Sequence, residues 1–463
     1  MKNKKKLLAL SLAVTCAMGA FASCGGKGDG PEAGATVVSV WLRDFEDGSN
    51  DVMKSVMDDF NKNKTDKLHI KYRFITEDAF LDALAAAQDN GTAPDIYQVS
   101  YMNLYSEVRN QTVLALDDLL PTASFEDLKD SAKSLVTYNG HYYGYPQLME
   151  PSAVMYYRKD LLEAAGVDYS KAEEWSFADL YAACAKLKKT MTKKEGKYPL
   201  LTYDFAQAGW ATQGLQANLT GGDVCLSSDW TKIVVDSQGY KELAKFFAEL
   251  YSNEYVPTTW TTGYNDQIID LCDGKAAIAY TGSWGIAEIM ESYGADMAQK
   301  IGVATVPTLN GGANKGTTAT NGGWSLVIDA KTKNAAAAAK IIEYLAAGED
   351  TTAPEKYFEA AHYSKSIPRK SLQAKVDAKD TSSACPEEWL KAVSSIAEKS
   401  IPEAIYTYDI NMQVIGLMQG IAIDVLDDVS LEDSWNSRID EVIAEIEKIV
   451  KNNDLAGKNP RLN

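Results

Sequence analysis

The chain has 463 residues, of which 46% are hydrophobic, and its formal charge at pH 7 is −18. This length predicts two domains, and the hydrophobic fraction is that of an ordinary globular protein. The acidic surplus argues against a nucleic-acid partner, because the chain carries no excess of basic residues to neutralise phosphates.

The N-terminus has the pattern of a secretory signal peptide. Four lysines lie within Met1 to Lys6, and the apolar run that follows, Leu7 to Phe21, is too short to span a membrane. Ala22-Ser23-Cys24 resembles the bacterial lipoprotein box, in which the cysteine is lipidated and becomes the first mature residue. We therefore predict a signal peptide at 1–23, a lipid anchor on Cys24 and a Gly-rich flexible linker at 24–35.

The mature chain begins with alternating strand and helix patterns. The spacing of apolar residues predicts strands at Val37–Leu42, Leu68–Ile75 and Ile96–Val99, with helices at Asp51–Lys62 and Phe80–Gln88. This order predicts a doubly wound α/β sheet. Polar residues follow two of its strands, namely Arg43-Asp44 and Ser100-Tyr101, and strand ends of this kind face one crevice.

A second domain is predicted after the tyrosine-rich turn around Asn139-Gly140, a hairpin signal. It opens with a strand at Ala153–Arg158 and a helix at Asp160–Ala165. The pattern beyond is largely helical, with helices expected at Phe177–Lys189, Gly239–Tyr251 and Tyr264–Cys272. Trp210, Trp230 and Trp260 lie in or beside the loops of this domain.

Two stretches set a tryptophan beside glycines and a strand. In the first, the strand Ala276–Tyr280 is followed by Gly282-Ser283-Trp284, and Ser283 is expected to cap a helix that runs to about Ala298. In the second, Asn321-Gly322-Gly323-Trp324 precedes the strand Ser325–Ile328. Trp284 and Trp324 are therefore predicted to present a flat apolar face, which suits the axial C–H face of a sugar ring.

Several short motifs follow one another along the mature chain. They are Ala93-Pro94-Asp95-Ile96, Leu114-Ala115-Leu116-Asp117, Gly140 with Tyr143-Gly144-Tyr145-Pro146, Tyr156 to Leu161, Trp175 to Leu180, Gly274-Lys275-Ala276-Ala277 through Trp284, and Gly322-Gly323-Trp324. Each motif is a loose match, but their order and spacing resemble those of family 1 extracellular solute-binding proteins, the relatives of maltose-binding protein that capture substrates for ABC importers. The resemblance covers nearly the whole mature chain.

The resemblance implies two α/β lobes of the type II periplasmic-binding-protein fold, joined by two or three crossing segments, with the ligand in a cleft that closes around it. We assign 36–147 and 282–348 to lobe 1, and 148–281 and 349–463 to lobe 2. The implied partners are a carbohydrate, such as an oligosaccharide, and the transmembrane subunits of an ABC permease. We expect a monomer, anchored by lipid on the extracytoplasmic face of the cell membrane.

The ligand-binding candidates combine aromatic and polar side chains. Arg43, Asp44, Tyr101, Trp284, Gly323 and Trp324 are expected to come from lobe 1, and Trp210 and Trp260 from lobe 2. Tryptophans suit the apolar faces of a sugar, while the polar groups suit its hydroxyl rim. A non-sugar solute such as a peptide or polyamine is the alternative ligand on the same fold.

An extracellular glycoside hydrolase is the enzymatic alternative, and it is disfavoured. The adjacent acidic pairs, such as Asp117-Asp118 and Glu387-Glu388, do not face one site across a glycosidic bond. His69, His141 and His362 are isolated, and no Gly-x-Ser-x-Gly is present, so no triad, cofactor or metal site is predicted. The mature cysteines beyond Cys24 form no zinc pattern, and buried thiols are favoured over a disulfide.

Overall fold

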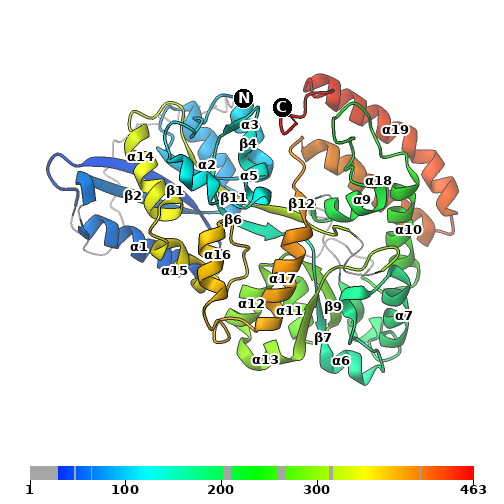
Figure 1. Ribbon diagram of the computed structural model, residues 1–463. Helices are drawn as coiled ribbons and strands as arrows, with labels where there is room; N and C mark the ends of the chain where they lie inside the picture. The colour runs from blue at the N-terminus through cyan, green and yellow to red at the C-terminus, as the bar shows by residue number, and fades with distance from the viewer. Residues whose placement is uncertain are drawn as a thin grey trace, which may run out of the picture.

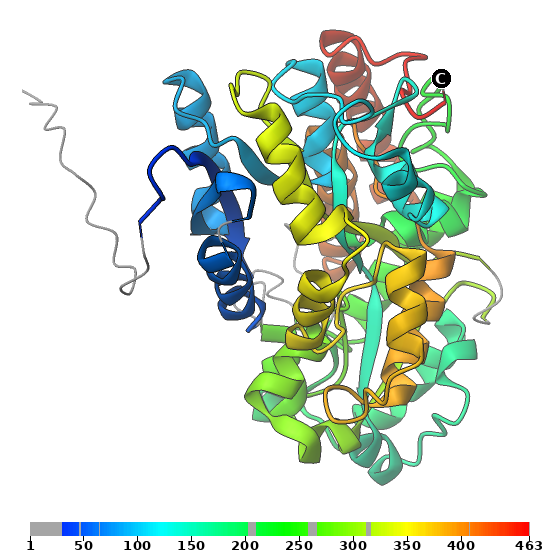
Figure 2. The same ribbon diagram turned by 60° about the vertical axis from the view of Figure 1, so that its left-hand side comes forward.

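A computed structural model describes residues 30–45, 48–63, 65–201, 210–257, 266–311, 316–406 and 408–462. Two separate sheets, each with its own helices, form two lobes (Figure 1). The view turned by 60° shows the same molecule from another side, with the green helices α12 (Gly285–Ser292) and α13 (Gly294–Lys300) at the bottom and the red C-terminal helix at the top (Figure 2).

The larger sheet belongs to the first lobe, and its strands run in the order β12-β11-β3-β1-β2, with β6 paired to β11. β1 pairs in parallel with β2 and β3, whereas β11 is antiparallel to β3 and β6. The bounds of these strands are β1 Thr36–Asp44, β2 Leu68–Thr76, β3 Ile96–Ser100, β6 Tyr145–Pro151, β11 Thr320–Ile328 and β12 Ile401–Pro402. The parallel β1–β3 unit confirms the predicted doubly wound arrangement.

Helices of the first lobe bury the apolar stripes that the sequence predicts. In α1 the residues Met53, Val56, Met57 and Phe60 are buried, one face of a 3.6-residue period. Asn139 and Gly140 adopt positive φ of 49° and 80° and turn the chain between two short strands, as predicted. The remaining elements of this lobe are α1 Ser49–Asn63, α2 Glu77–Asp89, α3 Tyr101–Arg109, α4 Thr122–Glu126, α5 Asp130–Val136, β4 Thr137–Tyr138, β5 His141–Tyr142, α14 Ala335–Ile342, η4 Glu343–Ala347, α15 Thr352–Ala360 and α16 Lys370–Asp377.

The smaller sheet belongs to the second lobe and has the order β10-β7-β9-β8. β9 is buried along its whole length, as its run of small apolar residues predicts. The elements of this lobe are β7 Val154–Arg158, α6 Lys159–Ala164, α7 Phe177–Leu187, β8 Tyr198–Leu201, α9 Gln213–Thr220, α10 Gln238–Ser252, α11 Asp266–Cys272, β9 Ala276–Thr281, α12 Gly285–Ser292, α13 Gly294–Lys300, β10 Ile301–Ala304, α17 Glu387–Lys399, α18 Tyr408–Leu426 and α19 Leu431–Asn452. Short 3-10 helices lie at Ala172–Glu174 and Lys193–Glu195 in this lobe and at Thr65–Lys67 before β2 of the first lobe.

Three of the segments that cross between the lobes lie side by side. The first joins β6 to β7, the second joins β10 to β11, and the third enters β12 from α17. Ser152 of the first crossing and Thr320 of the second are tied by three hydrogen bonds: Thr320 N–H to Ser152 Oγ at 3.0 Å, Thr320 Oγ1 to Ser152 Oγ at 2.9 Å, and Ser152 N–H to the Thr320 carbonyl at 2.9 Å. β12 pairs with the start of β11, which adds the third segment to the junction.

The lobe boundaries differ from those predicted. β10 pairs with β7, so residues 282–304 belong with the second sheet rather than the first. α15 packs on α1, and Arg369 pairs with Asp127 at 2.7 Å, so residues 352–377 belong with the first lobe. The sequence of a short apolar strand or amphipathic helix does not identify the sheet on which it will pack. We therefore assign these segments by their observed partners.

Two local predictions around the tryptophans are also corrected. Trp284, not Ser283, stands at the N-cap of α12, and no side chain caps that helix. The predicted single helix divides at Tyr293, where Gly294 adopts a positive φ of 72°. Trp324 lies inside β11 rather than before it, because the strand already begins at Thr320.

Within the described ranges, no helix combines the length and apolar character needed to cross a bilayer. Cys184, Cys225, Cys272 and Cys385 are buried and unpaired, as the sequence favours. Burial raises the pKa of the Cys225 thiol to about 11. These thiols therefore pack as small apolar groups.

Candidate functional site

The candidate site is built on two consecutive glycines of β11. Gly322 and Gly323 lie opposite Glu150 and Met149 of β6, beside the crossing segments. Gly323 has a φ of +126°, and a Cβ there would lie 2.5 Å from the carbonyl oxygen of Leu148. Only glycine fits this position, because it combines a conformation that other residues avoid with a close backbone approach.

Trp210 and Trp284 stack against each other beside these glycines. Their ring centroids are 5.8 Å apart, with an angle of 17° between the planes. The ring of Trp284 folds over Gly282, since a Cβ on that glycine would overlap the indole at 1.9 Å. The ring of Trp210 lies against Gly322, where a Cβ would approach it to 2.7 Å. Trp210 therefore lies against a bare stretch of first-lobe backbone and stacks on Trp284.

Trp324 is buried, with 8% of its surface exposed. Phe45 and Phe80 meet its ring edge-on at centroid distances of 5.9 and 6.3 Å, and the Arg43 guanidinium lies 4.9 Å from its centroid. Trp324 and Trp284 thus have different partners, and Trp324 packs as part of the first-lobe core. Its ring is also held by the cation–π contact with Arg43.

The other predicted polar residues of lobe 1 have structural partners. The Tyr101 side chain is fully buried, and its hydroxyl lies 2.7 Å from the Leu148 carbonyl oxygen and 3.1 Å from that of Trp324. Burial raises the pKa of Tyr101 well above its usual value. Asp44 accepts a hydrogen bond from the Asn50 side chain. The Tyr101 hydroxyl therefore links β11 to β6 next to the two glycines.

A buried ion pair that the sequence did not indicate borders the aromatic residues. Lys365 Nζ lies 3.1 Å from Glu150 Oε1, and the two side chains are only 2% and 9% exposed. The same ammonium lies 4.4 Å from the centroid of Phe45. The Phe45 ring thus contacts two cations, because the Arg43 guanidinium is 4.8 Å from its centroid.

A second buried carboxyl group, that of Glu403, lies near enough to Glu150 to feel its charge. Burial raises the pKa of Glu403 to about 8, and the charge of Glu150 adds to the rise. Arg461 and the Trp210 side chain oppose it. Glu403 Oε2 is 3.5 Å from the position that a Cβ on Gly322 would take, which places the carboxyl group beside the Trp210 ring.

The structure brings most of the predicted residues into one chain of contacts. Arg43 touches Trp324, Tyr101 contacts Trp324 and the Gly323 position, and Trp210 joins Gly322 to Trp284. Trp260 and Cys24 lie outside the described residues. Sequence reasoning missed Phe45, Glu150, Lys365 and Glu403. The only signal for two of them was an acidic residue next to a proline: Glu150 precedes Pro151, and Glu403 follows Pro402.

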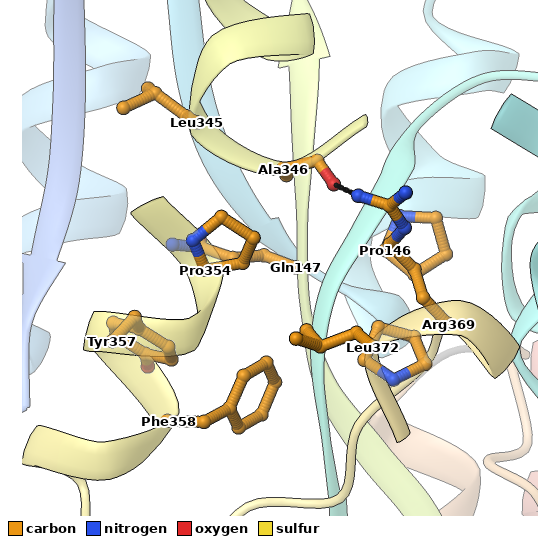
Figure 3. Close-up of a pocket in the computed structure, with 10 residues that line it drawn as sticks. Pro146, Gln147, Leu345, Ala346, Pro354, Tyr357, Phe358, Arg369 and Leu372 are labelled. Carbon is orange, nitrogen blue, oxygen red and sulfur yellow. Dashed lines mark hydrogen bonds between the residues drawn. The ribbon is translucent and has the colours of Figure 1, made fainter. Parts of the chain in front are cut away.

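Two cavities among the described residues are each only about 10 Å³ in volume. One is lined by Ala211, Thr212 and Tyr280 among others, directly after Trp210 in the chain. The other is lined by Gln147, Leu345, Phe358 and Leu372 among others, in the first lobe (Figure 3). Figure 3 also shows Arg369 donating to the Ala346 carbonyl at 2.8 Å beside this cavity. A space of this size holds about one water molecule, so it is a packing defect and not a sugar site.

Residues 46–350 match the model of the family described as bacterial extracellular solute-binding protein. The chain belongs to this family. It is 28% identical over 360 residues to the "Maltooligosaccharide ABC transporter solute-binding lipoprotein" of Streptococcus pneumoniae, covering 73% of this chain and 75% of the relative.

Solved structures share the two-lobed fold of this solute-binding protein. The GacH receptor of Streptomyces glaucescens, solved unliganded and with acarbose, has a TM-score of 0.72 and 20% identity, covering 90% of this chain and 99% of its own. The sugar-binding protein MalE of Xanthomonas citri has a TM-score of 0.67 and 20% identity, again over 90% and 99% of the two chains. At these identities the likeness establishes the fold, and it confirms the type II periplasmic-binding-protein prediction.

Proposed function

We propose that this protein is the substrate-binding lipoprotein of an ABC importer, and that it captures an oligosaccharide between its lobes. The observation that carries the proposal is the stacked pair Trp210–Trp284, presented by the second lobe against the glycine backbone of the first. An aromatic surface with neighbouring buried polar groups is the usual composition of a site for a small polar ligand with apolar faces.

The named relatives support a glucose-based ligand. The pneumococcal relative is a maltooligosaccharide-binding lipoprotein by name, and the GacH structures include complexes with acarbose and a homologue of it. Those ligands belong to the relatives. For this chain, we propose a maltooligosaccharide or a related short glucan as the first ligand to test.

A glycoside hydrolase is the less favoured function. Its chemistry needs two carboxyl groups that face a bound sugar from either side of the scissile bond. Glu150 is paired with Lys365, and Glu403 is fully buried behind Trp210 and Gly322. Neither carboxyl group is placed to reach a glycosidic oxygen, so we propose binding without hydrolysis.

We propose that delivery follows from a tether at Cys24. The linker at 24–35 would hold the folded chain outside the cell membrane, and the loaded monomer would dock on the transmembrane subunits of its permease. Without the four lysines of the signal peptide, the formal charge is more negative still. Anionic lipid would then repel the body of the protein, which favours a position away from the bilayer surface.

Calorimetric titration of the soluble chain, residues 25–463, tests the proposal. Maltose, maltotriose and maltotetraose are titrated beside a tetrapeptide, spermidine and free amino acids. We expect saturable binding to at least one maltooligosaccharide and none to the other solutes. Chromatography of maltotetraose after prolonged incubation with the protein should recover it intact. Binding only to the peptide or to spermidine, or release of glucose, would refute the proposal.

A further inference from the structure

Glu403 occupies an unusual place in the fold. It directly follows β12, the third crossing segment, where Pro402 pairs with Asn321 of β11. The next residue, Ala404, donates its backbone N–H to Gln213 Oε1 at 3.0 Å, at the first residue of α9. The segment that carries Glu403 is therefore fixed on one side to the first sheet and on the other to the helix that begins just after Trp210.

The Glu403 carboxyl group lies at the edge of the Trp210 ring. The ring and the carboxyl oxygen approach the same glycine, Gly322, where a Cβ would lie 2.7 Å from the indole and 3.5 Å from Glu403 Oε2. The Trp210 side chain acts as a donor toward Glu403, although its buried Nε1 does not reach strict hydrogen-bond geometry. The same Trp210 ring also stacks on the ring of Trp284.

The charged and titratable groups that face Glu403 come from four elements. Glu150 lies on β6, Tyr101 on α3, Tyr138 on β4 and Arg461 in the C-terminal segment. Arg461 Nη1 donates to the Glu403 backbone carbonyl at 2.5 Å and its guanidinium lies 6.0 Å from the Tyr138 centroid. Arg461 is therefore the cation that faces Glu403, while Lys365 pairs with Glu150.

We propose that Glu403 is a positioning residue for the sugar site: its carboxyl group holds the edge of Trp210 against Gly322 and so fixes the Trp210–Trp284 stack. This inference rests on the proposed function, because it assigns Glu403 a role in sugar affinity. Glu403 does not touch the sugar. It acts through Trp210, whose indole must lie flat on the glycine backbone for the stacked pair to face the ligand.

The proposal makes sugar affinity depend on pH. Burial raises the pKa of Glu403 to about 8, so the group is neutral at pH 7 and ionised above pH 8. Ionisation makes the carboxylate a stronger acceptor for the Trp210 side chain, and both Trp210 and Arg461 favour the ionised form. The edge of Trp210 is then held more firmly against Gly322. We expect affinity to rise as pH rises through about 8.

The experiment compares wild type with E403Q and E403A in the soluble chain. Circular dichroism of the ligand-free protein measures the exciton coupling of the two stacked indoles. W210F removes one indole, so the signal that this variant loses identifies the coupling. Titration with maltotetraose between pH 6 and pH 9 reads affinity. E107A is the matched control, because Glu107 is a partly buried first-lobe carboxylate bonded to Tyr97 and Gln88, away from the stack.

We expect E403A to lose the coupling and to bind maltotetraose about tenfold more weakly, the loss typical of one removed partner of a buried polar group. E403Q should retain the coupling, since its amide oxygen can still accept from Trp210, and its affinity should not change with pH near 8. E107A should keep both the coupling and the wild-type pH profile.

Retained coupling in a folded E403A, or a pH profile of E403Q identical to that of wild type, would overturn the proposal. If E403A does not fold, E403Q and its pH profile still decide. If wild type binds no maltooligosaccharide, the proposed function fails on its own. The coupling in the ligand-free variants then still tests whether Glu403 positions Trp210.

Discussion

The structure separates the two tryptophans that the sequence treats alike, and replacing each by alanine tests this separation. Trp324 is buried among Phe45, Phe80 and Arg43. Removing it empties a core site, so Trp324→Ala should lower the free energy of unfolding by about 3–5 kcal/mol without ligand. Trp284 is only partly buried and stacks on Trp210.

For Trp284→Ala the loss of stability should be smaller, since an aromatic pair contributes about 0.5–1.5 kcal/mol beyond its buried area. The loss in sugar binding should be larger. By analogy with stacking of nucleic-acid bases on aromatic side chains, it should be about 1–3 kcal/mol, or roughly 5- to 150-fold in the dissociation constant.

The assay pairs urea unfolding of the ligand-free variants with calorimetric titration of maltotetraose. Trp435→Ala is the control, because Trp435 is a buried tryptophan of α19 with 1% of its surface exposed. It should destabilise the chain and leave affinity at the wild-type value. The reasoning is refuted if Trp284→Ala destabilises the ligand-free protein as much as Trp324→Ala does and binds sugar normally.

Four further outcomes are expected. X-ray scattering should show the radius of gyration fall when maltotetraose saturates the protein, whereas an unchanged profile would contradict lobe closure. Mass spectrometry of the protein isolated from its own membranes should find diacylated Cys24 at the mature N-terminus, and an unmodified first residue other than Cys24 would exclude the anchor. Lys365→Met should destabilise the protein by about 3–5 kcal/mol, because it leaves Glu150 buried without its partner, and Glu150→Gln in the same chain should restore part of the loss. The free energy of unfolding should fall as pH rises from about 5 to 8, by up to about 1.4 kcal/mol per pH unit. The reason is that folded Glu403, with its pKa near 8, keeps a proton that the unfolded chain releases. E403Q should lack this pH-dependent component.

The sequence by itself determined the local elements of this protein. The period of Val38, Val40 and Leu42 marked β1, and the spacing of buried residues marked α1. Asn139-Gly140 marked a hairpin. These predictions succeed because the side-chain period of a strand or helix and the φ requirement of a turn are properties of a few neighbouring residues. The glycines of β11 were found for the same reason, since close approach of backbone excludes any side chain there.

Only the tertiary structure decided which elements belong together. β10 joins the second sheet because its backbone pairs with β7, and no local pattern in Ile301–Ala304 names that partner. The same limit applies to the site. Trp284 and Trp324 follow similar glycine-rich sequences, yet one stacks on Trp210 and the other lies in the core.

The buried charges were equally beyond the sequence. Glu150 and Glu403 are far apart in the chain, and each acquires its character from groups that folding brings to it: Lys365 for the first, Arg461 and Trp210 for the second. Desolvation and Coulomb interaction depend on distance in space and on the exclusion of water, not on separation along the chain. A carboxyl group with a pKa near 8 therefore exists only in the folded protein.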